Sequence, residues 1–222
     1  MTLHEISNTY KTDKNFEHDF YRRVYDNELI GIKESATKVC EIGVRGLWAD
    51  VGWTNGNSLR VWRDYFTNAE ILGLDIDTSG FDSLGERITV DFIDQSNKEQ
   101  VVEYSTRLVD YDVIIDDGSH RMYDQQITFA YFFKSLKSKG IFILEDLHTS
   151  PEVNIPEKNR IWGWGEPGKI TTLEMLFHYS ENSTIISDYL TKEEKTYLEN
   201  NIMNITIFDE KPGSFTSVIV KK

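Results

Sequence analysis

A chain of 222 residues, 39% of them hydrophobic and 13% aromatic, is long enough to bury the core of one domain and too apolar to be disordered. The formal net charge of −13 argues against nucleic acid or an anionic membrane surface as a partner, although local Lys and Arg side chains can still hold a small anionic substrate. The N-terminus lacks the basic start and apolar stretch of a signal peptide, and no apolar run approaches the ~18 residues of a membrane-spanning helix. We therefore expect one cytoplasmic domain over residues 1–222. The single Cys40 lies in an apolar run, which fits a reducing compartment and predicts a buried, inert thiol.

The first 30 residues are polar with scattered aromatic side chains, and Leu3, Ile6 and Tyr10 have helical spacing. This pattern predicts an N-terminal helical arm over residues 1–30. Two interpretations of the arm remain open. It packs on the domain, or, because polar groups alternate with aromatic ones, it covers a ligand crevice.

The rest of the chain alternates short apolar runs with helical patterns. Five runs predict buried strands of a parallel sheet, at residues 38–43, 71–75, 87–93, 111–116 and 140–144. Helices are predicted over about 58–66, 97–108, 121–138 with a C-cap at Lys139-Gly140, and 171–181, and Thr191 with Glu194 forms a capping box that opens another. Residues 202–208 and 215–220 predict a closing hairpin. The fold class is therefore α/β, with strand and helix repeated five times before a terminal antiparallel pair.

Polar side chains follow two of these runs at the point where each strand ends. Asp116, Asp117 and His120 lie at the end of the run 111–116, and Glu145 with Asp146 directly follows the run 140–144. In open α/β sheets, ligands bind in the crevice outside the carboxyl ends of the strands. We therefore expect these carboxylates and this imidazole to line one site.

Gly43 and Asp75 end the first two predicted strands. A glycine at a strand-to-helix turn lets a ligand approach backbone N–H groups, and an acid at the tip of the next strand binds ribose hydroxyls in nucleotide-type sites. A capping or solvated loop aspartate is the structural alternative for Asp75. The G-x-G-x-x-G fingerprint is absent, which disfavours a nicotinamide cofactor.

Residues 151–169 show no helical or strand period. They contain Pro151, Pro156 and Pro167 together with Trp162 and Trp164. A long loop in a compact domain is usually functional or disordered, and tryptophans argue against disorder. We predict a substrate lid, with a core role for the two tryptophans as the alternative.

Several motifs in this order resemble those of class I S-adenosylmethionine-dependent methyltransferases. The resemblance is strongest to the metal-dependent sugar O-methyltransferases of macrolide biosynthesis and their capsule and cephalosporin-hydroxylase-like relatives. It implies a Rossmann-like methyltransferase fold with S-adenosylmethionine and Mg²⁺ or Mn²⁺ as cofactors. It also implies a carbohydrate or nucleotide-activated sugar as acceptor, in surface-polysaccharide or natural-product biosynthesis. The motifs, within residues 10–150, are Lys11-Thr-Asp-Lys14 with His18 and Tyr21, Glu41-Ile-Gly43, Asp75, Asp94-Gln-Ser96, Asp116-Asp-Gly-Ser-His120 and Glu145-Asp146.

The glycine motif departs from the family pattern, because an insertion with Trp48 and Trp53 follows it. The resemblance nevertheless implies a set of cofactor contacts. Asp75 should bind the ribose diol, Gly43 should lie against the methionine portion, and Glu41 should accept from the methionine amine. The remaining expected cofactor-binding residues are Asp94 and Gln95 beside the adenine, together with Lys14, Ser58 and Asp116.

Methyl transfer to a sugar hydroxyl requires a base, because the alcohol is protonated at neutral pH. An imidazole can take up a proton near neutral pH, so His120 is the expected base, acting with Asp117, while His148 is the alternative. Asp117, Glu145 and Asp146 offer hard oxygen ligands that suit Mg²⁺ or Mn²⁺, which would acidify and orient the hydroxyl. The structural alternative for these groups is helix capping for the carboxylates and a backbone hydrogen bond for the imidazole.

Two other classes of function remain as alternatives. One is an iron-dependent hydroxylase on the same fold. The facial triad of such an enzyme needs two histidines and one carboxylate, and the two histidines would have to be His120 and His148. The other is a cofactor-binding module without catalysis. The sequence is compatible with a homo-oligomer and does not identify the acceptor.

Overall fold

The computed structural model describes residues 1–12, 14, 21–45, 55–81, 84–149, 166, 168–211 and 214–222, without the side chains of residues 210, 211 and 214. The lid expected at 151–169 therefore lies outside the described residues, apart from residues 166, 168 and 169. The same holds for four tryptophans and one histidine of the sequence analysis, namely Trp48, Trp53, Trp162, Trp164 and His18.

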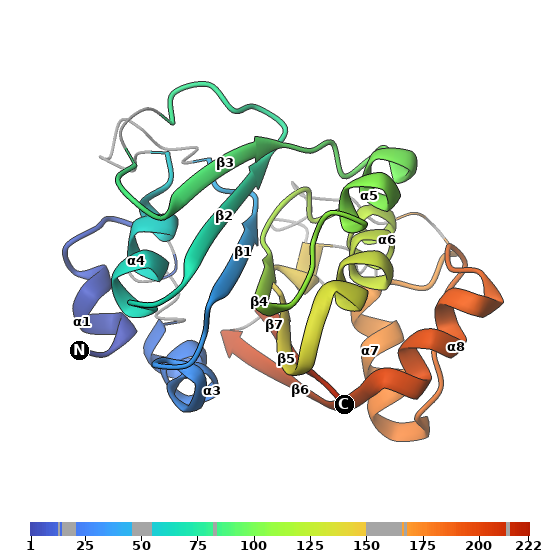
Figure 1. Ribbon diagram of the computed structural model, residues 1–222. Coiled ribbons are helices and arrows are strands. Elements are labelled where there is room, and N and C mark those ends of the chain that lie inside the picture. The colour runs from blue at the N-terminus through green and yellow to red at the C-terminus, as the bar shows by residue number, and fades with distance from the viewer. Residues whose placement is uncertain are drawn as a thin grey trace.

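The described strands form one seven-stranded sheet in the order β3-β2-β1-β4-β5-β7-β6 (Figure 1). The first five strands are parallel, β7 runs antiparallel to β5, and β6 runs antiparallel to β7. The strands are β1 Lys38–Ile42, β2 Glu70–Asp75, β3 Ile88–Phe92, β4 Tyr111–Asp116, β5 Leu136–Leu144, β6 Ile202–Lys211 and β7 Ser214–Lys221. The expected α/β class, the mostly parallel sheet and the closing hairpin are confirmed.

The strand order reverses between β1 and β4, since β2 and β3 lie on one side of β1 and β4 and β5 on the other. Such a switch point is where open α/β sheets bind their ligands. Asp116 pairs with Ile42 of β1 and with Leu144 of β5. One residue further on, the amide of Asp117 donates to Ile42 O and the amide of Glu145 donates to Asp116 O, both at 3.0 Å. The polar residues after β4 and β5 therefore leave the sheet at the same edge, as expected.

Helices cover both faces of the sheet (Figure 1). One face carries the N-terminal helices and α4, and the other carries α5 to α8. The bounds are α1 Leu3–Ser7, α3 Asp26–Leu29, α4 Asn57–Tyr65, α5 Lys98–Ser105, α6 Met122–Phe132, α7 Thr172–Asn182 and α8 Lys192–Asn201, with short helical turns η1 Tyr21–Tyr25, η2 Ile30–Ile32, η4 Phe133–Ser135 and η5 Leu147–Thr149. No helix in the described part of the chain is long and apolar enough to cross a membrane.

Side chains of the central strands alternate between two buried cores, because successive strand residues point to opposite faces. On β4, Val113 and Ile115 belong to the core under α1, η1 and α4, while Ile114 belongs to the core under α5 to α8. On β5, Ile143 and Phe142 divide in the same way. This alternation continues beyond the strand ends and decides which acid faces which side of the sheet.

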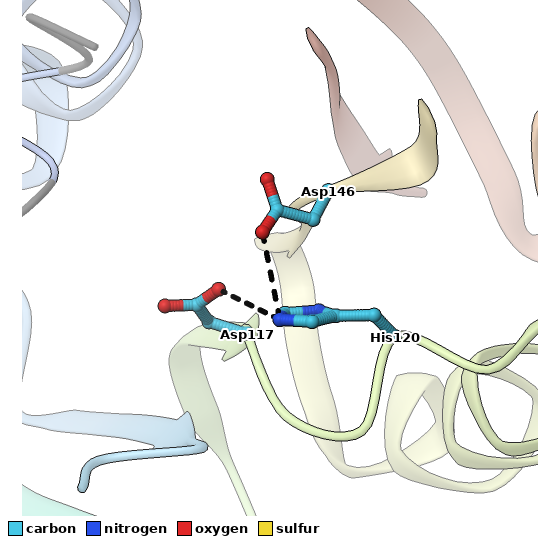
Figure 2. Close-up of side chains that lie close together, drawn as sticks. All are labelled: Asp117, His120 and Asp146. Carbon is cyan, nitrogen blue, oxygen red and sulfur yellow. Dashed lines mark ion pairs between the residues drawn. The ribbon is translucent and has the colours of Figure 1, made fainter. Parts of the chain in front are cut away.

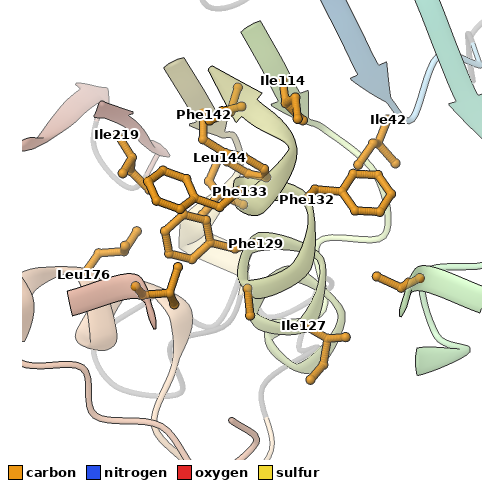
Figure 3. Packing of buried hydrophobic residues seen from close by; sticks show 14 of the residues in the cluster. Ile42, Ile114, Ile127, Phe129, Phe132, Phe133, Phe142, Leu144, Leu176 and Ile219 are labelled. Atoms are coloured by element: carbon orange, nitrogen blue, oxygen red, sulfur yellow. The ribbon is translucent and has the colours of Figure 1, made fainter. Parts of the chain in front are cut away.

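Aromatic side chains dominate the core between the sheet and α6 (Figure 3). The ring of Phe129 meets those of Phe133 and Phe142 edge to face, each at a centroid distance of 5.2 Å. Cys40 is buried in the same core, which confirms the expected burial of its thiol, and burial raises its pKa well above the ordinary value.

The N-terminal arm packs on the opposite face of the sheet. Leu3, Tyr21 and Tyr25 are fully buried, and the two tyrosine rings lie 5.4 Å and 5.3 Å from the ring of Trp62 on α4. Its first helix begins with a capping box at Thr2, whose hydroxyl accepts from the amide of Glu5. The arm is therefore an integral layer of the domain, and its role as a cover for the crevice stays a prediction.

The predicted helix 121–138 is wrong in its second half. Helix α6 ends at Phe132, a short turn follows, and β5 begins at Leu136, which pairs with Tyr111. Lys139-Gly140 is consequently part of a strand and not a helix C-cap. Leu136 has extended backbone angles of φ −72° and ψ 145°, so its apolar side chain reaches the core from a strand.

The strict alternation of strand and helix is also wrong at one step. No helix stands between β2 and β3 in the residues that the structure describes there, 76–81 and 84–87. The capping box predicted at the start of α8 is confirmed, because the Thr191 hydroxyl accepts from the amide of Glu194.

Candidate active site

A cleft of about 380 Å³ opens where β1, β2 and β4 end. Asp75 lies on its wall, 7% exposed, and its carboxylate organises the turn after β1. One oxygen accepts from the amides of Val44 and Arg45 at 2.9 Å and 3.1 Å, and the other accepts from the amide of Asp77 at 3.0 Å. The cleft is lined by Ile42, Gly43, Asp75, Ile76, Ile93, Asp94, Gln95, Ser96, Gly118, Ser119, Arg121 and Asp124.

Gly43 lets the turn after β1 approach the loop after β4. Its φ is +81°, and a Cβ added there would overlap the carbonyl of Asp117. The turn therefore requires glycine for both conformation and space.

Gln95 joins the cleft wall to the end of β4. Its Nε2 donates to Asp116 at 2.9 Å and to Thr128 at 3.2 Å, while its Oε1 accepts from the amide of Ser119 at 2.8 Å. Burial raises the pKa of the Asp116 carboxyl to about 7, although the hydrogen bonds from Gln95 and Gly118 oppose this shift. Asp94 lies in the same wall and accepts from the amide and hydroxyl of Ser96.

Glu41, at the end of β1, is fully buried. Its Oε2 accepts from the hydroxyl of Ser58 on α4 at 2.6 Å, and its Oε1 lies 3.7 Å from Lys14 Nζ. Burial raises the pKa of this carboxyl to about 7, against the opposing effects of Lys14 and Ser58. Three of the residues expected near the cofactor are thus brought together on the side of the sheet that the N-terminal arm covers.

Lys14 also reaches the acids after β4 and β5. Its ammonium, 3% exposed, forms an ion pair with Asp117 and lies 3.2 Å from each carboxylate oxygen of Glu145. Tyr25 donates its hydroxyl to Glu145 from the other side. Burial raises the pKa of Glu145 well above its usual range, and the charge of Asp117 adds to this effect while Lys14 opposes it.

Asp117, His120 and Asp146 form a second group at the same edge (Figure 2). His120 Nε2 lies 3.9 Å from Asp117 Oδ1 and 3.5 Å from Asp146 Oδ2. One donor atom from each residue falls within 4.8 Å of the others, and all three side chains are partly exposed. His120 and Asp146 have left-handed backbone angles, with φ of +56° and +52°, a strained conformation that is common at functional sites.

His148, the alternative base, lies on the far side of Asp146. Its Nδ1 is 3.8 Å from Asp146 Oδ1, whereas His120 faces the other oxygen of that carboxylate. Within the described residues, the grouped donors are two carboxylates and one histidine, and His148 is not among them. Such an oxygen-rich set suits Mg²⁺ or Mn²⁺ better than the two-histidine triad of iron oxygenases.

The expected metal ligands are divided between these two groups. Asp117 and Asp146 face His120, while the side chain of Glu145 faces Lys14 and Tyr25. The alternation of β5 explains the division, since Glu145 continues the face of Ile143 and the adjacent Asp146 continues the opposite one. Asp117 belongs to both groups, because one oxygen faces Lys14 and the other faces His120.

Two contributors were missed by sequence reasoning, Tyr25 and Thr128. Tyr25 reaches Glu145 across 120 positions in the chain, and Thr128 holds Gln95 from within α6. Because side chains alternate along β5, the sequence could have predicted that Glu145 and Asp146 face opposite sides of the sheet. No local sequence pattern predicts that Tyr25 contacts a residue that follows β5.

The chain is similar in sequence and in fold to known O-methyltransferases. Mycinamicin VI 2''-O-methyltransferase of Micromonospora griseorubida is 35% identical over 150 residues, which cover 67% of this chain and 36% of that protein. Demethylmacrocin O-methyltransferase of Streptomyces fradiae is 30% identical over 148 residues, which cover 67% of this chain and 37% of that protein. The structure of MycE methyltransferase from the mycinamycin pathway, in complex with Mg and SAH, superimposes with a TM-score of 0.75 at 28% identity and covers all of this chain. The chain has the class I methyltransferase fold and is homologous to macrolide-sugar O-methyltransferases.

The similarity covers only part of these homologues. The chain spans 36% and 37% of the two curated sugar O-methyltransferases and 55% of MycE. A second structure, an O-methyltransferase from Bacillus cereus in complex with SAH, has a TM-score of 0.52 at 13% identity and supports the fold alone. No family model matches the chain.

Proposed function

We propose that this protein is an S-adenosylmethionine-dependent, divalent-metal-assisted O-methyltransferase that acts on a sugar hydroxyl. The observation that carries the proposal is the position of the oxygen-rich group beside His120, at the same sheet edge as a cleft lined by Gly43 and Asp75. The relatives named as O-methyltransferases, among them one named for an alpha-L-rhamnosyl tetracenomycin, support the same reaction class.

The cleft after β1, β2 and β4 is the proposed cofactor site. Asp75 can accept from the ribose hydroxyls while it also holds the turn after β1, since each carboxylate oxygen has more than one lone pair. Ile76 is 63% exposed in the cleft and offers an apolar surface to an adenine ring beside Asp94. Bound S-adenosylmethionine would supply an electrophilic methyl group on its sulfonium.

Glu41, Ser58 and Lys14 lie deeper, at the end of β1. The buried Glu41 carboxylate is suited to accept from the amine of the methionine portion, and Ser58 orients it through a 2.6 Å hydrogen bond. In this proposal Lys14 does not line the cleft. It acts on the cofactor through Glu41, because its ammonium is 3.7 Å from Glu41 Oε1. Gln95 and Asp116 support the wall by binding each other.

His120 is the proposed base. Its imidazole is partly exposed, and its Nε2 faces both Asp117 and Asp146. In this role Nε2 takes the proton of the attacking hydroxyl. Asp117 and Asp146 would hold Mg²⁺ or Mn²⁺, with Glu145 as the further expected ligand, and the ion when bound would lower the pKa of an acceptor hydroxyl and orient it.

A free or nucleotide-activated sugar, or a sugar on a larger natural product, is the proposed acceptor. Two relatives, named for an L-olivosyl-oleandolide and for an alpha-L-rhamnosyl tetracenomycin, act according to their names on a sugar attached to a larger molecule. The decisive experiment is calorimetric titration of S-adenosylmethionine with and without Mg²⁺, followed by a mass-spectrometric methylation screen over glycosylated macrolides, nucleotide sugars and capsule-type monosaccharides. Methylation of a sugar would support the proposal, and failure to bind the cofactor would overturn it.

The same titration tests the two alternatives. An iron-dependent hydroxylase would bind Fe²⁺ without needing S-adenosylmethionine. A cofactor-binding module without catalysis would bind S-adenosylmethionine and methylate no acceptor in the screen. The pairing of one histidine with two aspartates favours the methyltransferase.

A further inference from the structure

Lys14 lies at the centre of a cluster of three acids, of which Glu41 and Glu145 are buried. Three carboxylates surround its ammonium, contributed by Glu41 at the end of β1, Asp117 after β4 and Glu145 after β5. Lys14 and Glu145 are each no more than 3% exposed, and Glu41 is not exposed at all. A single N-terminal side chain thus places one positive charge among the acids at the carboxyl ends of three neighbouring strands.

Two of these three acids belong to the expected metal set. Asp117 directs one oxygen to Lys14 and the other towards His120, and both oxygens of Glu145 lie 3.2 Å from the ammonium. A divalent ion that takes Glu145 as a ligand must therefore approach the position that the ammonium now occupies. Two cations cannot share that position, because like charges at such distances repel strongly in a poorly solvated site.

The other expected ligand is arranged differently. Asp146 lies outside the lysine cluster and faces the two histidines His120 and His148. Asp117 and Asp146 are partly exposed and open to an incoming ion, while Glu145 is closed off by Lys14 and Tyr25. Recruitment of Glu145 would thus be the step of metal binding that requires the lysine to move.

We propose that Lys14 is a built-in counter-cation that competes with the divalent ion for Asp117 and Glu145, and thereby sets the metal affinity of the site. This inference rests on the proposed function only in taking those acids as metal ligands. Lys14 is a positioning residue in this account, since it acts through the two carboxylates and touches no reacting atom.

The test measures Mn²⁺ binding by electron paramagnetic resonance, with neither cofactor nor acceptor present. Lys14→Met should bind Mn²⁺ at least ~10-fold more tightly than the wild type. Removal of a unit charge about 4 Å from the ion, at an effective dielectric constant of about 20, would allow a larger gain in affinity than this. Lys14→Arg retains the charge and should stay near the wild-type affinity. Lys11→Met is the matched control, because it removes a positive charge from an exposed position of the same segment and should also leave the affinity near that of the wild type.

A second measurement on the wild-type protein covers the case in which Lys14→Met does not fold. Saturating Mn²⁺ should increase the acetylation rate of Lys14, read by mass spectrometry, while the exposed Lys192 on α8 is labelled at an unchanged rate. The proposal is overturned if Lys14→Met binds Mn²⁺ no more tightly than the wild type, or if labelling of Lys14 does not respond to metal. Neither readout needs turnover, so the lack of a suitable acceptor or of methyl transfer is a failure of the proposed function alone.

Discussion

His120 Nε2 lies 3.5 Å from Asp146 Oδ2, although His120 follows β4 and Asp146 follows β5. Asp117 Oδ1 is 3.9 Å from the same nitrogen (Figure 2). A base and two acids in this arrangement should divide their work between proton transfer and metal binding. That division gives variants with different responses to added metal.

His120→Ala should lose turnover by ~10²–10⁴, the usual range for removal of a general base. Mn²⁺ affinity should change little, and excess Mg²⁺ should not restore the rate. Asp146→Asn should reduce turnover as partial chelation does, and excess Mg²⁺ should rescue it, because a weakened ligand set still saturates at high ion concentration. Initial rates of methyl transfer against Mg²⁺ concentration measure both responses. Full activity of the wild type in chelator would contradict the metal assignment, and wild-type turnover of His120→Ala would move the role of base to His148.

The cofactor assignment is tested at Asp75. Asp75→Ala should weaken S-adenosylmethionine binding by a few kcal/mol, since two charge-assisted hydrogen bonds contribute ~1.5–3 kcal/mol each. Calorimetry measures this loss, and Asp77→Ala serves as the control because that neighbouring acid pairs with Arg45 at the surface.

Asp75 also holds the backbone after β1, so the ribose contact must be separated from the turn. A 2′-deoxy analogue of S-adenosylhomocysteine achieves this. The wild type should bind the analogue more weakly than the parent compound, and Asp75→Ala should bind the two equally. An unchanged preference in the variant would remove the ribose assignment.

The sequence predicted the sheet because its signals are local. Short apolar runs end in Gly43, Asp75 and Asp116, and each run became a strand with its polar end at the ligand edge. Helix 121–138 was extended too far because Leu136 satisfies helical spacing with Phe129 and is equally buried in a strand. An apolar side chain near a helix end can reach the core from a helix or from a strand, and its residue type does not distinguish the two conformations.

The sequence did not predict which of the expected site residues contact one another. Glu145 and Asp146 are adjacent in sequence, and the pleat of β5 sends them to different groups. Lys14 meets Glu145 across 131 positions, a pairing that only the packing of the N-terminal arm decides. Residue types indicate which chemistry a site can perform, whereas the partner of each charge depends on tertiary contacts.

The close approach of β1 and β4 depends on Gly43. Gly43→Ala should lower the free energy of unfolding by about 3 kcal/mol or more, because the new Cβ combines a strained positive φ with overlap of the Asp117 carbonyl. Gly31→Ala is the matched control, since a Cβ there meets nothing within 4 Å, and it should change the stability by no more than about 0.5 kcal/mol. Urea denaturation of both variants gives the comparison. Equal stability of the two would show that the turn relaxes without cost.

The pH dependence of stability should carry the signature of Glu41. The folded pKa of this carboxyl is about 7 and its ordinary value is 4.5, with burial as the main cause. Between these values the folded protein binds more protons at Glu41 than the unfolded chain does, so the free energy of unfolding falls as pH rises. Stability from this group is complete below about pH 4.5 and is lost by about pH 7, a loss on the order of 3 kcal/mol.

Glu41→Gln should make the slope shallower by the share that Glu41 contributes, because the amide does not titrate, while Asp116 and Glu145, whose pKa values burial also raises, keep their own share. Glu193→Gln on α8 replaces an exposed acid and should retain the wild-type profile. Urea denaturation in steps from pH 4 to pH 8 measures all three proteins without cofactor. If the wild type and Glu41→Gln lose stability in parallel across this window, the buried carboxyl is ionised throughout and Lys14 compensates it fully.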